Sequence, residues 1–324
     1  MLSRTAENLY WLGRYLERAE NIARMVDVEY HAEIEAGPAA ASGSNTWEAL
    51  VTAIGGREEF TRLTSAHEAE GGIDPGDFLV LAIDNPNSVR SAVTIARNLA
   101  RGLREFISRE VWAEINALYL VLSRRRHLEQ AEMFDICSSI KRSIETVFGL
   151  YDNTVLFEEG REWFRTGIYL ERADMTSRII DAKYHILLPS IDEVGGALDR
   201  FQWAAILRSA SAWEAFRKTV RGTPTGPRVA EFLIHHAQFP RSLTFGVMAM
   251  LRHYQNATVS SPPRMRRSAE RAMTLLQIDL AARHTDEIIE SGLHEFLDEF
   301  QQRLIEISTL MHDNIFRAVP ERVA

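Results

Sequence analysis

The chain has 324 residues, of which 46% are apolar and 25% charged, and its formal net charge is -8. This composition is typical of a globular protein and excludes disordered, collagen-like and disulfide-rich chains. The length predicts about two domains, and the acidic balance argues against a broad nucleic-acid-binding surface. All basic residues except Lys141, Lys183 and Lys218 are arginine, whose planar fork suits carboxylates and phosphates.

Apolar residues recur at helical spacing along most of the chain. In chain order, helices are predicted over residues 5–35, 88–127, 129–150, 158–188, 200–220, 228–237, 241–256 and 265–316. Clusters of Gly, Pro and Ser separate them at 37–43, 71–76, 195–196, 222–227 and 260–263. The short apolar run 78–83 fits either a strand or a buried helical turn. An all-α helical bundle is therefore the fold class that we expect.

Cysteine content and hydropathy indicate where the protein works. Cys137 is the single cysteine and lies in an apolar stretch, so we expect a buried small side chain and no disulfide. The N-terminal residues carry charges throughout, which does not fit a signal peptide. No run approaches about 18 uncharged apolar residues, the minimum for a membrane-spanning helix. We expect a cytoplasmic protein with no membrane partner.

One segment of the sequence occurs twice. Residues 13–31, GRYLERAENIARMVDVEYH, align with residues 167–185, GIYLERADMTSRIIDAKYH, at a constant offset of 154, and ten of the nineteen positions are identical. The same offset relates 77–79 to 231–233 and 86–88 to 240–242. Because such agreement does not arise by chance, the chain contains a duplicated unit.

The duplication changes the expected domain organisation. Instead of two different domains, we predict two tandem helical repeats, residues 1–154 and 155–324, that share one core. By analogy with isologous dimers, the repeats should be related by a pseudo-twofold axis.

Charged side chains form a stripe on one side of the duplicated helix. On a helical wheel the stripe has apolar residues on both of its borders, so we expect it to be partly buried. Its members are the candidate catalytic or ligand-binding residues. They are Glu17, Glu20, Arg24, Asp27 and His31 in the first copy, and Glu171, Asp174, Arg178, Asp181 and His185 in the second.

Three interpretations of the stripes are open. In the first, the stripes face each other, and Arg24 and Arg178 pair with acids of the opposite helix. In the second, the carboxylates and histidines bind a metal, although Asp27 and His31 lack the Glu-x-x-His spacing of di-metal bundles. In the third, the stripes form a ligand-binding or catalytic cleft for a carboxylate, phosphate or amine.

Two duplicated helix starts, together with neighbouring arginines, are candidate anion sites, because a helix N-terminus attracts anions. Simple capping explains the same residues. These candidates are Asn85, Ser88, Arg90, Arg241 and Ser242. The basic clusters at 124–127 and 264–267 fit solvated helix ends rather than a nucleic-acid surface. No phosphate-binding loop or HExxH motif is present, so no cofactor is expected.

The opening SRTAENLYWLGRYLERAEN at 3–21 and the second YLERA at 169–173 resemble the bacterial alpha-E family, which is named for its helices and its Glu-Arg motif. The motif falls on Glu17, Arg18, Glu171 and Arg172. Arg18 and Arg172 point away from the charged stripe, as salt-bridge partners or anion contacts. The aromatic of the first helix is Trp11, whereas the second copy has Arg165, with Trp163 nearby.

The resemblance implies a function through genomic neighbours. Alpha-E proteins are typically encoded beside circularly permuted ATP-grasp ligases, or fused to them, often with transglutaminase-like peptidases. It therefore implies an accessory or partner of an ATP-grasp peptide ligase. Two alternatives remain: an enzyme in which Glu17, Glu171 and the stripe histidines perform acid–base chemistry on an amino acid or peptide, and a purely structural homo-oligomer.

Overall fold

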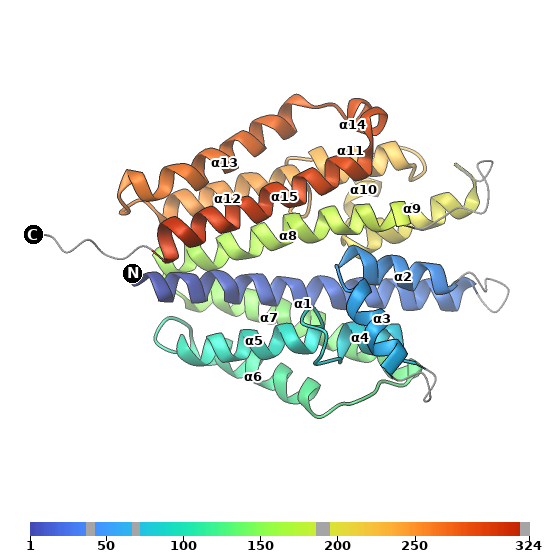
Figure 1. Ribbon diagram of the computed structural model, residues 1–324, viewed down its shortest axis with the longest axis horizontal. Helices are drawn as coiled ribbons and strands as arrows, with labels where there is room; N and C mark the ends of the chain where they lie inside the picture. The colour runs from blue at the N-terminus through green and yellow to red at the C-terminus, as the bar shows by residue number, and fades with distance from the viewer. Residues whose placement is uncertain (37–42, 67–71, 186–194, 318–324) are drawn as a thin grey trace, which may run out of the picture.

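The computed structural model describes residues 1–36, 43–66, 72–185 and 195–317. These residues form fifteen α-helices and a terminal π-helix, with no strand among them, which confirms the all-α prediction (Figure 1). The helices are α1 (Ser3–Ala36), α2 (Gly43–Ala53), α3 (Arg57–Ala66), α4 (Pro75–Val80), α5 (Val89–Gly102), α6 (Arg109–Ser123), α7 (Gln130–Thr154), α8 (Glu159–His185), α9 (Ala197–Ser209), α10 (Trp213–Thr219), α11 (Gly226–His235), α12 (Leu243–Ala257), α13 (Pro263–Ala282), α14 (Thr285–Ser291), α15 (Leu293–Met311) and η3 (His312–Phe316).

Local sequence explains where several helices begin and end. The first half of the ambiguous run 78–83 lies in α4, whose first turn is capped by Asp74, and the second half follows the helix as a turn. The predicted segment 88–127 is divided into α5 and α6, and Ser108 caps the start of α6. The predicted segment 265–316 is also divided, because Gly292 adopts a φ of 111° between α14 and α15. Glycine is the residue that accepts this conformation without strain.

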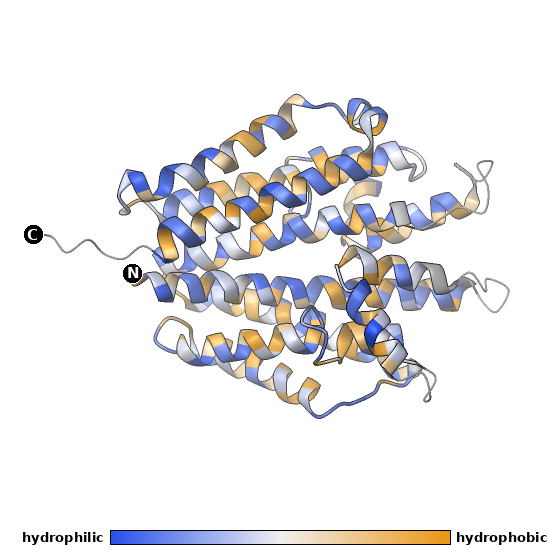
Figure 2. Cartoon of the chain, in the orientation of Figure 1, coloured by the Kyte–Doolittle hydropathy of each residue, from blue (hydrophilic) through white to orange (hydrophobic). Residues whose placement is uncertain are grey.

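Helices α1 and α8 lie side by side through the middle of the molecule (Figure 1). Helices α5 and α7 pack on α1, and α12 and α15 pack on α8. Figure 2 shows that the long helices mix hydrophobic and hydrophilic residues, as expected for amphipathic helices around a common interior. Buried apolar residues from both parts of the chain form one cluster. The division into repeats at residue 154 stays a prediction.

Two glycines of the duplicated segment allow α1 and α8 to touch. A Cβ atom on Gly13 would overlap the carbonyl oxygen of Phe164, and one on Gly167 would overlap the carbonyl oxygen of Tyr10. The helix backbones are therefore in direct contact at this crossing. Each glycine stands one turn before the glutamate of its Glu-Arg motif, so the crossing brings both motifs to the opposite helix.

Replacement of Gly13 by alanine tests this contact. The added methyl group must separate α1 from α8, and we expect Gly13→Ala to lower the free energy of unfolding by about 1–3 kcal/mol. Gly149→Ala in α7 is the matched control, because nothing lies within 4 Å of the added Cβ. Urea unfolding should show the control to be as stable as the parent or slightly more so. Equal stability of the two variants would contradict the close crossing.

Candidate functional site

Glu17 is completely buried at the α1–α8 crossing. Arg172 of α8 donates to it through Nε and Nη2, each at 2.8 Å from a different carboxylate oxygen. Arg241 adds a bond of 3.0 Å from Nη1 to Oε1, and the Asn21 amide donates to the same oxygen at 2.9 Å. Such bidentate guanidinium–carboxylate geometry is the strongest arrangement available to a buried acid.

Glu171 is the equivalent residue of α8 and is also completely buried. Arg18 of α1 donates to it through Nε at 2.5 Å, and Arg14 does so through Nε at 2.7 Å. The arginine of each Glu-Arg motif therefore binds the glutamate of the other copy. We call Glu17, Arg18, Glu171 and Arg172 the reciprocal clasp.

The second arginine on each glutamate comes from a different place in the two copies. Arg241 precedes α12, at a position where the first copy has Asn87. Arg14 lies in α1, where the second copy has Ile168. Asn87 instead accepts a bond of 3.4 Å from Arg18. Each carboxylate thus has two guanidinium partners, but the sequence duplication supplies only one of them.

The environment fixes the charge of both glutamates. Burial raises a carboxyl pKa, but the positive charges of Arg172 and Arg241 outweigh burial and hold the pKa of Glu17 at about 2. Arg18 and Arg14 likewise hold the pKa of Glu171 at about 2 against burial. Both groups therefore remain carboxylates at neutral pH, with little tendency to accept a proton.

One of the three interpretations paired Arg24 and Arg178 with acids of the opposite helix, and the structure shows other partners for both. Arg24 pairs with Glu20, one turn earlier on α1. Arg178 binds Asp174 on α8, with 2.8 Å between Nε and Oδ2. Because the glycine crossing brings the flanks of the helices together, Arg18 and Arg172 reach across instead. Arg24 and Arg178 pair with acids one turn earlier on their own helices.

The other end of each stripe contacts a different neighbouring helix. Asp27 accepts a bond of 2.5 Å from Lys141 of α7, and His31 Nε2 lies 3.7 Å from Asp27. His31 is 48% exposed on the side chain. Asp181 is 2.6 Å from His294 of α15. The side chain of His185 lies outside the described residues.

These contacts bear on the cleft and metal interpretations. The acidic residues of the two stripes are divided among separate ion pairs instead of lining one shared cleft. In the part of the chain that the structure describes, no group of three or more His, Cys, Asp or Glu side chains is arranged to hold a metal ion.

Most of the candidate anion residues at the helix starts form hydrogen bonds with backbone groups of the chain itself. Ser88 and Ser242 cap α5 and α12, each accepting a backbone N–H at 3.1 Å. Asn85 donates to the carbonyl of Phe78 at 3.0 Å. Arg90 donates to two carbonyl oxygens at the end of α6, both at 3.1 Å. Arg241 is the exception, because it extends from its helix start to Glu17.

The remaining predictions concern single side chains. Cys137 is buried, and burial raises the pKa of its thiol to about 12, which makes it unreactive. Trp163 is buried against Tyr254, whereas Trp11 is half-buried beneath the guanidinium of Arg14. The aromatic residue therefore has a different environment in each copy.

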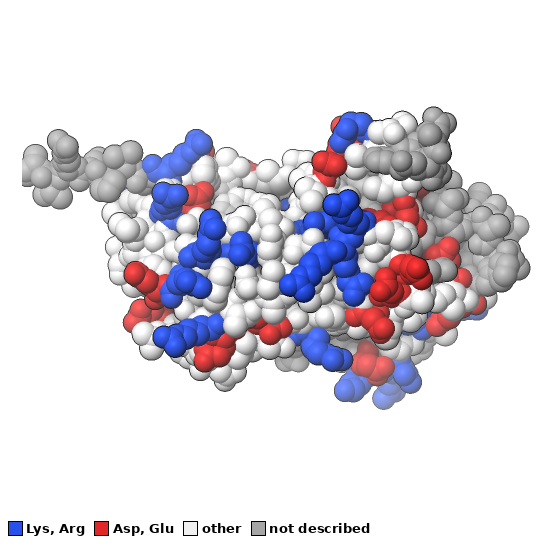
Figure 3. All heavy atoms as spheres, turned by 90° about the horizontal axis from the view of Figure 1, so that it is seen from below, with Lys and Arg blue, Asp and Glu red and all other residues white. Residues whose placement is uncertain are grey.

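Basic side chains gather in groups on the face nearest α6, with acidic ones mostly toward its ends (Figure 3). Exposed arginines at either end of α6 include Arg104, Arg109, Arg124 and Arg126. Arg125 pairs with Glu132 at 3.2 Å, as expected of a solvated helix end. Within the described residues, no helix is long and apolar enough to cross a membrane.

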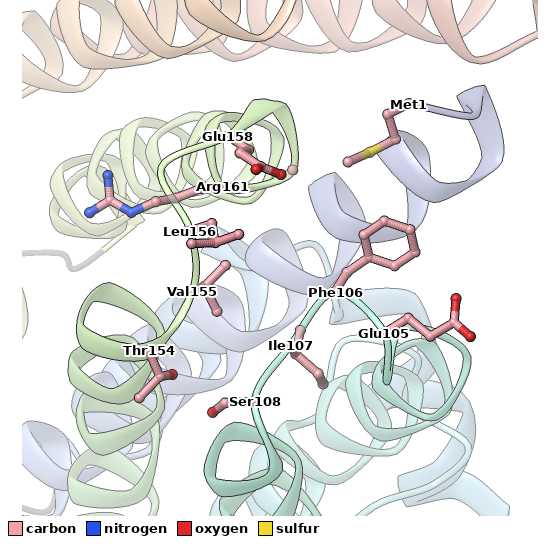
Figure 4. Close-up of a pocket in the computed structure, with 11 residues that line it drawn as sticks. Met1, Glu105, Phe106, Ile107, Ser108, Thr154, Val155, Leu156, Glu158 and Arg161 are labelled. Carbon is pink, nitrogen blue, oxygen red and sulfur yellow. The ribbon is translucent and has the colours of Figure 1, made fainter.

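Two hollows were not predicted from the sequence. The first, which we call the junction cavity, has a volume of about 240 Å³ and lies where α7 leads into α8, lined by Phe106, Val155 and Leu156 (Figure 4). The second, the Trp11 groove, has a volume of about 360 Å³. Its polar or aromatic lining residues include Glu7, Trp11, Arg14, Asp174, Ser308 and His312. Residues from several helices form each hollow, so helical periodicity gives no signal for them.

The fold and the site define a class of protein: an all-α bundle whose two central helices are joined by Glu-Arg pairs. Known proteins of this class are found by sequence similarity. The family model Alpha-E, described as a predicted alpha-helical domain with a conserved ER motif, matches residues 1–316. The chain belongs to the Alpha-E family. Uncharacterized proteins of Mycobacterium bovis and Mycobacterium tuberculosis are similar to it, each 22% identical over 332 residues that cover 96% of this chain. This chain spans 36% of the length of these relatives. No solved structure was found to match it.

The pH dependence of stability tests the charge of the clasp. Because the folded pKa of each glutamate lies below its ordinary value of 4.5, the clasp stabilises the fold above pH 4.5 and loses its effect as the pH falls toward 2. A Glu17→Gln, Glu171→Gln variant should therefore unfold more easily at pH 7, by on the order of 3 kcal/mol for each carboxylate. The difference from the parent should shrink between pH 5 and pH 2.

Urea titrations at a series of pH values make this measurement. Glu306→Gln, at an exposed position of α15, is the control and should follow the parent at every pH. A clasp variant that is as stable as the parent at pH 7, or whose deficit grows in acid, would show that the glutamates do not act as buried carboxylates.

Proposed function

We propose that this chain is a cytoplasmic helical binding partner of an ATP-grasp-type ligase that forms amide bonds. The resemblance to alpha-E proteins supports the class of the partner. One observation carries the choice of a binding protein: both motif glutamates are buried beneath two arginines each. A motif enclosed in this way serves to build the scaffold, and the partner then binds to the surface of that scaffold.

The enzyme alternative would use Glu17 and Glu171 for acid–base chemistry. A general base works best when its pKa lies near the operating pH. The arginine partners hold both pKa values at about 2, despite burial, and neither side chain is open to a substrate. The geometry of the motif therefore supports binding over catalysis by these two residues.

The junction cavity is the surface that we assign to the ligase. Leu156 lines one side and Phe106 the other, and both are exposed (Figure 4). Phe157, the next residue after Leu156 in the chain, is 78% exposed. Exposed apolar groups around a hollow mark a protein-interaction site. Glu105, Glu158 and Arg161 also line the cavity, and Arg161 is already paired with Asp152 at 2.9 Å. An apolar segment of the ligase that carries a basic side chain would match both features.

Replacement of the two exposed apolar residues tests this docking surface. We expect Leu156→Ser, Phe157→Ser to abolish co-purification with a co-expressed ATP-grasp-type ligase from the same genome, while the melting temperature stays unchanged. Ile278→Ser is the matched control, because Ile278 is an exposed apolar residue on α13. It should retain the complex. A parent chain that forms no complex at micromolar concentration would contradict the partnership, and an unaffected complex in the double variant would contradict the assigned surface.

A further inference from the structure

The Trp11 groove has the size and lining of a small-ligand site. It lies between α1 and α15, with residues of α8 at its base, and its volume of about 360 Å³ falls within the range of such sites. Buried Leu170 and Leu304 contribute apolar surface, and the half-buried Trp11 adds an aromatic ring. Charged groups stand toward both ends of this apolar surface.

Arg14 stands at the inner end of the groove, near the carboxylate of Asp174. Arg14 pairs with the buried carboxylate of Glu171, and Asp174 pairs with Arg178. Arg14 uses Nε for Glu171 and Nη1 for the hydroxyls of Tyr10 and Ser308. Among the described residues Nη2 makes no hydrogen bond. This unused N–H group can donate a charge-assisted hydrogen bond to an anionic group of a ligand.

The outer end of the groove has a carboxylate. Glu7 is part-exposed, and its Oε1 lies 3.1 Å from His312 Nδ1. The bond engages one oxygen, and the carboxylate retains capacity to accept from a cation. Glu7 and Arg14 are seven residues apart on α1, which corresponds to about 10 Å along the helix axis. An extended peptide advances about 3.3–3.6 Å per residue, so about three residues cover this separation.

We propose that the Trp11 groove binds a short peptide with free ends, about three residues long. Its carboxylate lies at Arg14 Nη2, its ammonium group lies at Glu7, and its apolar body lies over Trp11. The π-helix that begins at His312 is an independent indication, because such segments occur frequently at functional sites. This binding site does not depend on the docking of a ligase to the junction cavity.

Titration calorimetry of the purified full chain with trialanine tests the proposal. We expect saturable binding of the free peptide. An N-acetyl cap or a C-terminal amide should each weaken it about tenfold or more, since each removes a charge-assisted hydrogen bond. Two results would overturn the proposal. One is binding that does not change with either cap. The other is no saturable binding at about 10 mM peptide, which is about ten times a weak Kd of about 1 mM.

Variants identify the groove as the place of binding. Glu7→Gln should weaken the free peptide about tenfold and leave the N-acetyl peptide unchanged, because the ammonium partner alone is lost. Trp11→Ala should weaken both peptides. Glu105→Gln in the junction cavity is the control and should bind like the parent. The melting temperature of each variant checks that it is folded. Equal affinity of the parent and the Glu7→Gln variant for the free peptide would overturn the assignment.

Discussion

The fold depends on two buried glutamates, one on α1 and one on α8, each of which is bound by an arginine of the opposite helix. A buried carboxylate loses its hydration, and only well-aligned partners can compensate for that loss. At this crossing Arg172 satisfies Glu17 and Arg18 satisfies Glu171, which is possible only when both helices have the correct register. The direct backbone contact at Gly13 and Gly167 brings the side chains within reach. The clasp therefore specifies one arrangement of the two central helices.

The two copies have diverged around this shared clasp. Near Glu17, Asn21 and Arg241 complete the hydrogen bonds, and Arg241 also binds Glu20 at 2.9 Å. Near Glu171, Arg14 takes the second position and borders the Trp11 groove. One copy is thus enclosed by its own network, whereas the other adjoins a hollow with spare polar capacity.

The sequence was sufficient to predict the all-α fold and the membership of the Alpha-E family. Helical periodicity is set within each helix, so it gives α1 and α8 directly. It does not reveal which residues meet across a crossing. For that reason periodicity alone does not decide between Glu20 and an acid of the opposite helix as the partner of Arg24. Arg241 is distant from Glu17 in the sequence, and its position there indicates only a helix start. The two hollows depend on side chains from several helices, which no single wheel describes.

A double-mutant cycle between Glu17 and Arg172 tests the central claim most directly. Urea unfolding would be measured for Glu17→Gln, for Arg172→Gln and for the variant with both changes. A buried, bidentate pair predicts that the double variant is more stable than the sum of the single losses implies, with a coupling of about 1.5–3 kcal/mol. Additive losses, within about 0.5 kcal/mol, would show that the two residues act independently and would contradict the clasp.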